Sequence, residues 1–318
     1  MPTISLRPAE PERDFKQLAA WFSLLEDDPS TEASLKEYYA KENARVTQRV
    51  AETEQGELLG FYWTIRKREE PSQVIIFLYV KPEQRGQGIG RRLYTDLERV
   101  TAGTGTKQLV VGIRDNWSEG RRFAERCGFI EGGSQIAMAL NLTAFDDRPY
   151  DALLAKLKGE GFQFTSLEAL GNTEDAQRKL YHLNNMTGGE IPGSDGKPTW
   201  ASFEDYQRRV CQAAWYKPGG ELVVIESATG DWVAMSAITR MEGKDYAYNL
   251  HTGVDERYRG RKLAQAVKVL ALRYAREVLQ VTEVRSNHNI QNLPMIAINR
   301  KFGYRQISGS LWMEKVCS

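Results

Sequence analysis

The sequence predicts a mixed α/β protein with two tandem domains, each built on a mixed β-sheet. The length of 318 residues exceeds that of a usual single domain, which favours two domains. A β-prone apolar run, a glycine-containing loop and an amphipathic helix follow one another twice, about 174 positions apart. Both copies end alike, in Cys127-Gly128-Phe129 and in Phe302-Gly303-Tyr304. Two long copies indicate two domains, whereas a solenoid would need several short repeats.

The first copy begins with a continuous apolar run at residues 75–80, which predicts a buried strand. Residues 85–90 then read Arg-Gly-Gln-Gly-Ile-Gly, and apolar side chains at helical spacing predict a helix over residues 91–100. Around this copy we expect strands at residues 4–6, 58–65 and 107–113, and helices at residues 14–25 and 120–126.

In the second copy, residues 246–254 predict a strand, residues 259–264 read Arg-Gly-Arg-Lys-Leu-Ala, and a helix follows. We expect a hairpin of residues 221–226 and 232–240, a strand at 281–285 and a helix at 294–301. Residues 143–150 interrupt the pattern, so the expected domains are 1–145 and 146–318. Residues 184–197 are rich in Gly, Asn and Pro and predict a long loop, either one that contacts substrate or a variable surface loop.

The glycine loops have the chemistry of a diphosphate site. Backbone N–H groups in the first turn of a helix lack intrahelical partners, and the positive end of the helix dipole adds to their attraction for anions. Glycine at positions 86, 88 and 90 allows phosphate oxygens to approach the backbone, while Arg85 and Arg91 add positive charge. A dinucleotide fold would need Gly-x-Gly-x-x-Gly and a later acidic residue, and the spacing here is different. The alternative is a tight strand-to-helix turn that binds nothing.

These residues resemble the GNAT superfamily of acyltransferases. Arg-Gly-Gln-Gly-Ile-Gly matches its pyrophosphate motif, Gln/Arg-x-x-Gly-x-Gly/Ala, and Cys127-Gly128-Phe129 resembles the end of its acyl-CoA core. The second half resembles the C-terminal domain of bacterial tandem GNAT proteins at residues 252–254, 259–264 and 292–299. The resemblance implies two GNAT domains in tandem that use acetyl-CoA, or another acyl-CoA, as co-substrate without a metal.

By this resemblance, the pantetheine arm lies beside the strand that precedes each loop, and the diphosphate lies on the loop. An asparagine after the next strand contacts the arm. In the first half, the residues so assigned are Leu78, Tyr79, Val80, Arg85, Gly86, Gln87, Gly88, Ile89, Gly90, Arg91 and Asn116. In the second half, they are Thr252, Gly253, Val254, Arg259, Gly260, Arg261, Lys262, Leu263, Ala264 and Asn292.

The family pattern is broken at two places. The second loop has Lys262 at the glycine of the motif, where its side chain either clashes with a phosphate or binds one. The general acid of the family is a tyrosine four residues before the final glycine, and this position holds Ala124 in the first half and Asn299 in the second. Neither side chain can protonate a leaving thiolate, so the usual tyrosine mechanism is not expected in either half.

His251 is the leading candidate for the general base. It lies on the strand beside the expected thioester position, and an unperturbed histidine has a pKa near about 6.5. Tyr248 is the second catalytic candidate, and a structural role is the alternative for His251. In the first half Tyr79 lies at the corresponding strand, where aromatic core packing is the simpler interpretation. The polar residues around His251 therefore favour the second domain for acceptor chemistry and leave nucleotide binding to the first.

The expected activity is that of an N-acetyltransferase, which transfers an acetyl group from acetyl-CoA to a primary amine by direct attack. A small-molecule amine is the expected acceptor, and a non-catalytic acyl-CoA binding or sensing protein is the alternative. A net charge of +1 speaks against a nucleic-acid partner. No apolar run approaches the roughly 20 residues of a membrane span, and the first residues lack the charged-then-apolar layout of a signal peptide. With three scattered cysteines, we expect a cytoplasmic protein without a membrane anchor or a structural metal.

Overall fold

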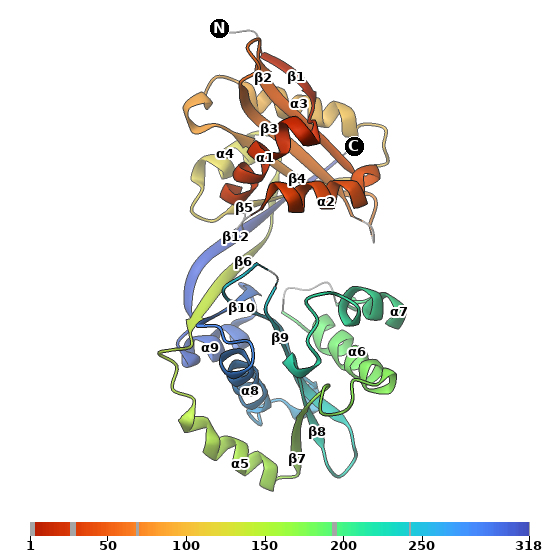
Figure 1. Cartoon of the computed structure of the whole chain (residues 1–318), viewed down its shortest axis with the longest axis vertical. Coiled ribbons are helices and arrows are strands. Elements are labelled where there is room, and N and C mark those ends of the chain that lie inside the picture. Colours follow the sequence, from red (N-terminus) through yellow and green to blue (C-terminus); the bar gives the residue numbers. More distant parts are fainter. Residues whose placement is uncertain (1–3, 26–29, 68–69, 193–195, 242, 318) are drawn as a thin grey trace. The chain divides into compact units, whose positions relative to one another are not determined.

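The computed structural model describes residues 4–25, 30–67, 70–192, 196–241 and 243–317 (Figure 1). The chain forms two compact units. The first consists of Met1–Ser134 with Ser310–Ser318, and the second of Gln135–Gly309. Each unit has a mixed sheet with helices on both faces (Figure 1). The predicted fold class, a tandem pair of mixed α/β domains, is confirmed.

In the described part of the first unit, the strands follow the order β1-β2-β3-β4-β5-β12. β4 and β5 run parallel, and the other neighbouring strands run antiparallel. The strand beside β5 comes from the end of the chain, because Ser310–Val316 of β12 pair with Gln108–Arg114 of β5. The bounds are β1 Ile4–Pro8, β2 Val46–Thr53, β3 Leu58–Arg66, β4 Gln73–Val80, β5 Gln108–Arg114 and β12 Arg305–Val316.

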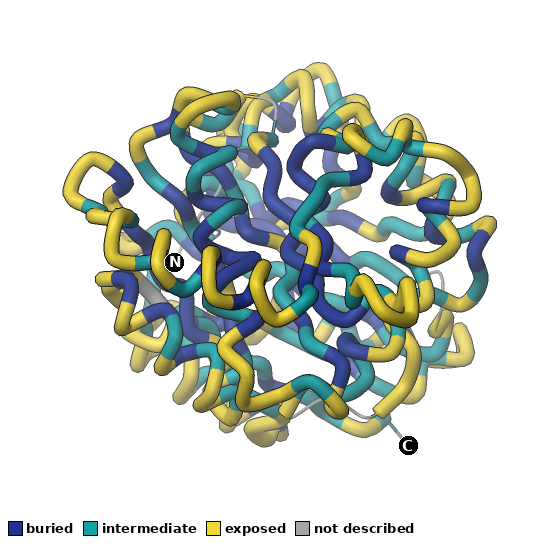
Figure 2. Tube along the Cα trace, turned by 90° about the horizontal axis from the view of Figure 1, so that it is seen from below, coloured by how far each residue is buried: buried dark blue, intermediate teal, exposed yellow. Residues whose placement is uncertain are grey.

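Two layers of helices cover the sheet of the first unit. Helices α1 (Pro11–Leu25) and α2 (Glu32–Glu42) lie on one face, and α3 (Ile89–Thr101) and α4 (Ser118–Arg126) lie on the other (Figure 1). α3 buries Leu93 and Leu97 in a core that includes Tyr62. On the other face, α1 packs Phe15 edge-on against Trp63, with ring centroids 5.5 Å apart. Buried residues follow the strands and the inner sides of the helices (Figure 2).

The second unit repeats this plan, with the strand order β6-β11-β10-β9-β8-β7 among the described residues. β10 and β11 are its parallel pair. Helices α6 and α7 lie on one face of the sheet, and α5, α8 and α9 on the other (Figure 1). The strand bounds are β6 Ile130–Asn141, β7 Phe162–Ser166, β8 Glu221–Glu226, β9 Trp232–Thr239, β10 Ala247–Val254 and β11 Glu283–Asn289. The helix bounds are α5 Asp151–Gly159, α6 Glu174–Gly189, α7 Phe203–Tyr206, α8 Leu263–Glu277 and α9 Leu293–Phe302.

The expected loop over residues 184–197 is wrong at its beginning, because α6 continues to Gly189. Two contacts explain the helix. Oγ1 of Thr187 donates back to the carbonyl of Leu183 at 2.8 Å, and a Cβ at Gly188 would collide with the side chain of Thr199. The glycine therefore allows close packing of a helix and does not mark a loop. Residues 193–195 of the expected loop lie outside the described residues.

The compact units also differ from the expected division after residue 145. Residues 135–145 pack with the second unit, because Gln135–Asn141 of β6 pair antiparallel with Glu283–Asn289 of β11. Residues 310–318 pack with the first unit, because β12 completes the sheet beside β5. Pairing between strands that are distant in sequence sets this division. It therefore cannot be predicted from the local change in composition at residues 143–150.

Candidate functional site

The two glycine loops share one backbone conformation. Gly86 and Gly260 have φ angles of 75° and 80°. Gly88 and Lys262, the N-cap residues directly before helices α3 and α8, have φ angles of 83° and 66°. Lys262 thus adopts the left-handed conformation that glycine adopts freely and that costs other residues free energy. The shape of the loop is kept although its sequence is not.

The first arginine closes each loop in the same way. Nε of Arg85 donates to the carbonyl of Val80 at 3.2 Å, and Nε of Arg259 donates to the carbonyl of Val254 at 3.3 Å. Arg259 also forms an ion pair with Glu190 at the end of α6. Arg85 forms a similar ion pair with Glu119, with Nη1 3.4 Å from Oε2, so in both units an acidic residue already balances the first arginine of the loop.

Both loops present unpaired backbone donors. No described residue accepts a hydrogen bond from the backbone N–H groups of residues 86–91 or 260–265. A Cβ built at Gly86, Gly88 or Gly260 would meet no other part of the chain within 4 Å, so the space in front of these glycines is open. Free donors at the start of a helix fit a diphosphate. The other predicted loop residues lie on the same loops or in the first helical turns: Gln87, Ile89, Gly90, Arg91, Arg261, Leu263 and Ala264.

The strand before each loop separates from its parallel neighbour. The β4–β5 ladder ends at Ile76 and Val111, although both strands continue. The β10–β11 ladder ends at Tyr248 and Arg285, although both strands again continue. Backbone groups beyond these points have no ladder partner on that side and can pair with an extended ligand. The predicted pantetheine residues lie on these segments: Leu78, Tyr79 and Val80 in β4, and Thr252, Gly253 and Val254 in β10.

The two strands differ in one feature, a β-bulge. β4 pairs with β3 without a register shift. In β10, Asn249 and His251 face consecutive residues of β9, so Leu250 between them is an extra residue. Residues three apart on a regular strand point to opposite faces, and one extra residue brings them to the same face. The bulge therefore places the two predicted catalytic residues, Tyr248 and His251, on the same face of the sheet.

His251 is held by a threonine of α6. Its Nε2 lies 2.8 Å from Oγ1 of Thr187, which itself lies 2.8 Å from the carbonyl oxygen of Leu183. Because a carbonyl only accepts, this arrangement favours a hydroxyl that donates to Leu183 and accepts from Nε2–H, which leaves a lone pair on Nδ1. Gly253 permits the contact, since a Cβ there would collide with Thr187. Burial, with a smaller contribution from the charge of Lys268, lowers the pKa of His251 to about 4, so the ring is neutral at pH 7.

Lys268 is a buried ionisable residue that sequence reasoning missed. It lies on α8, is 0% exposed, and donates from Nζ to Oδ1 of Asn249 on the opposite face of β10 from His251. Lysines of amphipathic helices are normally exposed, so the residue type alone does not indicate that Lys268 is buried. The available signal is its place in the apolar stripe, since residues three, four and seven positions later are Ala271, Leu272 and Ala275.

Glu221, the first residue of β8, is a second buried ionisable residue that the sequence did not reveal. It is 4% exposed, and no described group hydrogen bonds to its Oε2. Glu221 and His251 both lie opposite Ala237 of β9, one on each side, so all three point to the same face. Burial raises the pKa of Glu221 to about 8, so the carboxyl group is mostly protonated at neutral pH.

The predicted asparagines and the expected acid position supply no catalytic acid. Asn116 is exposed in the turn after β5. Oδ1 of Asn292 accepts from the backbone N–H of Met295 at 3.4 Å and caps α9. Asn299 is fully buried, with Nδ2 2.6 Å from Nε2 of His288. An amide at this place takes part in core hydrogen bonding and cannot donate a proton to a thiolate.

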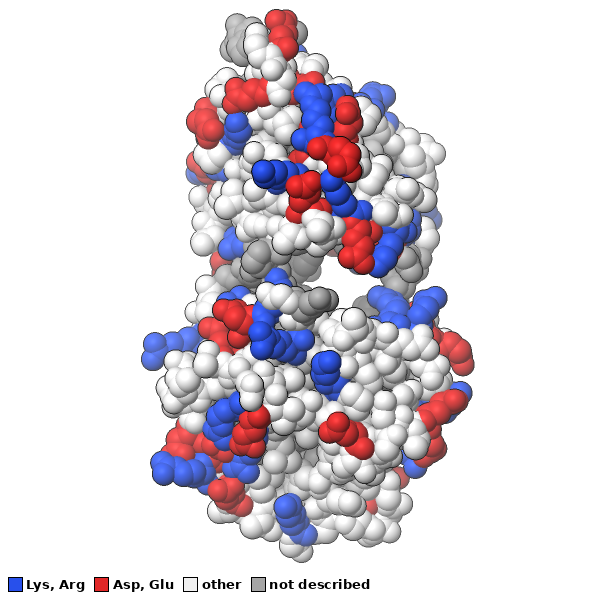
Figure 3. Space-filling view, in the orientation of Figure 1, with Lys and Arg blue, Asp and Glu red and all other residues white. Residues whose placement is uncertain are grey.

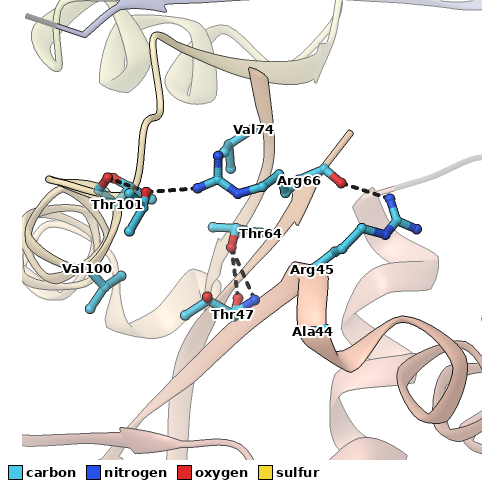
Figure 4. A pocket seen from close by; sticks show the side chains of 9 residues that line it. Ala44, Arg45, Thr47, Thr64, Arg66, Val74, Val100 and Thr101 are labelled. Carbon is cyan, nitrogen blue, oxygen red and sulfur yellow. Dashed lines mark hydrogen bonds between the residues drawn. The ribbon is translucent and has the colours of Figure 1, made fainter. Parts of the chain in front are cut away.

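A pocket of about 220 Å³ lies in the first unit, away from its glycine loop (Figure 4). It lies beside Val74 at the start of β4, whereas the loop follows the other end of that strand. Arg66 donates to Oγ1 of Thr104 at 2.8 Å and to Oγ1 of Thr106 at 2.9 Å, so its guanidinium group already has hydrogen-bond partners within the chain. None of the predicted site residues lines this pocket, which is formed by Ala44, Arg45, Thr47, Thr64, Arg66, Val74, Val100, Thr101 and Thr104.

Membrane and metal features can be stated for the described part of the chain. No helix there is both long enough and apolar enough to cross a bilayer. Within the same residues, no group of three or more His, Cys, Asp or Glu side chains is arranged to hold a metal ion. Cys127, Cys211 and Cys317 are free thiols.

Comparison with known proteins assigns both units to one family. A profile of the acetyltransferase (GNAT) family matches residues 15–129, and a profile of an acetyltransferase (GNAT) domain matches residues 169–305. A protein named 5-NmdU N-acetyltransferase, from Pseudomonas phage PaMx11, is 34% identical over 87 residues. That match covers 27% of this chain and 59% of the phage protein.

Solved structures give the same fold over the whole chain. A GCN5-related N-acetyltransferase from Sphaerobacter thermophilus superposes with a TM-score of 0.72 at 18% identity, covering 98% of this chain and 95% of that one. A tandem GNAT protein from the clavulanic acid biosynthesis pathway superposes with a TM-score of 0.70 at 16% identity, covering 99% and 98%. At these identities the likeness establishes the fold.

Proposed function

The chain belongs to the acetyltransferase (GNAT) family, and we propose that it transfers an acetyl group from acetyl-CoA to the primary amine of a small molecule. In this proposal the second unit carries the chemistry, and the first unit binds acyl-CoA without reacting it. The name of the phage relative, an N-acetyltransferase, supports nitrogen as the accepting atom.

The bulge in β10 is the observation that carries the proposal. It brings His251 and Tyr248 to one face, at the point where β10 separates from β11. Phe77 lies as far before the first loop as His251 lies before the second, and it has no proton to exchange. Tyr79 of the same strand packs in the core, with its ring 5.1 Å from that of Trp21. An amine acceptor must lose a proton, and this difference favours the second unit for acceptor chemistry.

We assign the steps as follows. The amine nitrogen attacks the thioester carbonyl, the C–N bond forms, and the C–S bond breaks to release the thiolate of CoA. A backbone N–H on the separated segment of Thr252–Val254 donates to the carbonyl oxygen, where negative charge develops. Nδ1 of His251 takes the proton from nitrogen, and the phenol of Tyr248 supplies one to the thiolate. As the products leave, His251 releases its proton to water and the phenolate of Tyr248 takes one up, which restores both side chains.

The low pKa of His251 fits this order of events. At about 4 the ring is neutral over the physiological range but is a weak base. It cannot remove a proton from a free ammonium group, so the acceptor must bind as the neutral amine. Once the C–N bond has formed, the nitrogen carries positive charge beside a carbon that bears oxygen, and it becomes far more acidic. A weak base that is already in place then suffices.

We propose that both loops hold the diphosphate of acyl-CoA. Their unpaired N–H groups and open glycines support this, since a diphosphate needs several donors at close range. Lys262 is exposed and leads into α8 with the same backbone conformation as Gly88. Its ammonium group can therefore reach a phosphate without changing the path of the loop.

A small cytoplasmic amine is the partner we propose. Basic and acidic side chains are interspersed on the face that Figure 3 shows, without a basic stripe that would follow a nucleic acid. The net charge of +1 and three free cysteines support the same choice. The second candidate is an acyl-CoA sensor, favoured by the absence of the family tyrosine at Ala124 and Asn299.

Titration calorimetry with acetyl-CoA, followed by an amine panel assayed for CoA release, tests the proposal. We expect two binding sites per chain, one lost in Gly88→Glu and the other in Ala264→Glu. Turnover with the responsive amines should survive Gly88→Glu and disappear in Ala264→Glu. Binding without CoA release from any amine would leave the sensor, and the opposite dependence on the two variants would move the chemistry to the first unit.

A further inference from the structure

We propose that Lys268 is a positioning residue that holds the bulge of β10, through Asn249, in the conformation that brings His251 and Tyr248 together. The inference rests on the proposed function for its consequence, acetyl transfer, but the arrangement itself is independent of any ligand. Lys268 touches none of the reacting atoms, since it lies on the opposite face of the sheet from His251.

The surroundings of Lys268 are unusual for a lysine. It is 0% exposed on the inner face of α8, between apolar neighbours on that helix. Burial alone shifts its pKa, and no described carboxylate forms an ion pair with it. Oδ1 of Asn249 accepts from Nζ, and the ring centroid of Tyr304 lies 5.3 Å away. The charge of Lys268 also contributes to the lowered pKa values of His251 and His288, both about 4, so these neighbours are neutral as well. Burying such a group is costly, so its retention calls for a role other than packing.

The contact with Lys268 fixes which way the amide of Asn249 points. In its charged form Nζ carries only donors, so it must face Oδ1. Nδ2 then faces the backbone, where it donates to the carbonyl of Ala237 at 2.8 Å and to the carbonyl of His251 at 3.4 Å. A flipped amide would set Nδ2 against Nζ and leave both carbonyls without this donor.

These amide bonds lie where the ladder is interrupted. The register shifts between Asn249 and His251, so the regular β9–β10 hydrogen bonds fail at Leu250. The side chain of Asn249 bridges the interruption, from the carbonyl of Ala237 on β9 to that of His251 on β10. Oγ1 of Thr252 adds a bond of 3.2 Å to Oδ1 of Asn249. The backbone around the extra residue, Leu250, is thereby held by the side chain of Asn249, which is itself oriented by Lys268.

The first unit shows what the same place looks like without a bulge. Tyr94 occupies the position in α3 that Lys268 occupies in α8, counted from the first residue of each helix. Tyr94 lies with Tyr62 and Ile76 in one apolar cluster, and β4 is regular there. The bulge and the buried lysine thus occur together in the second unit, and neither occurs at the corresponding place in the described part of the first, whose register shift lies between β2 and β3.

Titration does not remove the contact. Burial lowers the pKa of Lys268 to about 7, so the amine changes charge near neutral pH. Both forms carry N–H donors, and Oδ1 of Asn249 accepts from either. When charged, the same group also contributes to the lowered pKa of His251.

Lys268→Met tests the proposal, because methionine keeps the length and apolar stem of lysine but cannot donate. We expect amide hydrogen exchange at residues 249–252 to accelerate at least tenfold relative to β11. We also expect kcat to fall at least tenfold, while the KM for acetyl-CoA stays within threefold. Lys301→Met, the same change at an exposed lysine of α9, should alter neither quantity.

The double variant Lys268→Met/Asn249→Leu separates positioning from stability. Leucine replaces the amide by an apolar group of similar shape, so the double variant should regain thermal stability without regaining kcat or the slow exchange of residues 249–252. Recovery of kcat in the double variant would overturn the proposal. So would unchanged exchange in Lys268→Met, or equal acceleration over the whole second unit. If the unmodified protein acetylates no amine, the proposed function fails, and the exchange measurement still decides the role of Lys268.

Discussion

β4 of the first unit and β10 of the second occupy the same place in their sheets but differ in the kind of side chain around them. Both precede a glycine loop, both separate from a parallel neighbour, and both are capped by an arginine that bonds back to the strand. Around β4 the inner layer is mainly apolar, with Ile76, Tyr62 and Tyr94 in one cluster, and its phenol groups hydrogen bond to Asp96 and Lys315. Around β10 the corresponding layer contains Asn249, Ser236 and Lys268.

In our proposal, this difference assigns acyl-CoA binding to both units and the acetyl transfer to the second. Holding a diphosphate and an extended arm needs backbone N–H groups, left-handed residues and open space, and both units have these. Exchanging a proton needs side chains on one face at one point of the strand, and the bulged strand has these. A buried polar layer also has a cost in stability, so a unit that does not react gains by keeping an apolar core.

The largest expected effect is on turnover, and it comes from replacing His251 of β10. His251→Ala should lower kcat about 1,000-fold, which corresponds to roughly 4 kcal/mol of transition-state stabilisation. The affinity for acetyl-CoA should stay within a few-fold, because the loops are unchanged. Steady-state kinetics on a responsive amine, with calorimetry of acetyl-CoA binding, measures both.

His182→Ala is the matched control, since His182 is exposed on α6 in the same unit. It should leave kcat unchanged. If His251→Ala keeps full turnover, the bulge gathers residues without a catalytic role, and the contrast between the strands no longer identifies the reacting unit.

The two buried carboxyl groups continue the comparison. Asp14 of the first unit is 1% exposed and accepts from Arg7 at 2.6 and 2.9 Å, whereas Glu221 of the second has no described partner for Oε2. Burial alone would raise the pKa of Asp14, but the bonds from Arg7 and from the backbone of Glu10 hold it below its usual range. Asp14→Asn should therefore lower the free energy of unfolding by about 3 kcal/mol at pH 7, as breaking a buried pair does.

Urea unfolding as a function of pH checks this value. A carboxyl group with a lowered pKa stabilises the fold above the pKa of the unfolded chain, about 3.9, and the contribution is lost as the pH falls through the folded value. The difference between Asp14→Asn and the unmodified protein should accordingly shrink below pH 4. A constant difference down to pH 2 would mean that the charge of Asp14 contributes nothing.

The sequence predicted the parts of the site that are local. A continuous apolar run, glycines at fixed spacing and a following amphipathic stripe define strand, loop and helix within about 25 residues, and these elements occur where expected in both units. The family resemblance follows from the same short motifs. The predicted catalytic pair could also be chosen locally, because polar residues on an otherwise apolar strand stand out.

What the sequence did not predict depends on contacts between distant residues. The bulge at Leu250 is a property of the pairing with β9, and no residue of β10 encodes it alone. Lys268 and Glu221 look like surface residues until the helix and strand are placed against their neighbours. β6 pairs with β11 in the second unit, and β12 pairs with β5 in the first, so both pairings join segments that are distant in the sequence. The helix through Gly189 was mistaken for a loop because glycine was interpreted as a breaker.

Glu221→Gln should change the free energy of unfolding with the opposite dependence on pH. A carboxyl group whose pKa is raised by burial to about 8 binds a proton more tightly in the folded chain than in the unfolded one. Its contribution therefore falls as the pH rises from about 4.5 to about 8, by up to roughly 1.4 kcal/mol per pH unit. Glutamine does not titrate, so the variant should become the more stable form as the pH increases. Thermal unfolding of both proteins from pH 5.5 to 8 measures the difference, in which all other groups cancel. Parallel curves would show that Glu221 is ionised and has found a partner.

The smallest effect comes from exchanging the residues directly before α3 and α8. Lys262 has a φ of 66° where Gly88 has 83°. Lys262→Gly should relieve the left-handed strain and raise the free energy of unfolding by about 1 kcal/mol, and Gly88→Lys should lower it by a similar amount. Because the backbone donors are the same in both loops, we expect each unit to keep its acetyl-CoA site in either variant, with affinities within about tenfold measured by calorimetry. If Lys262→Gly instead loses its site while gaining stability, the ammonium group of Lys262 holds the phosphate.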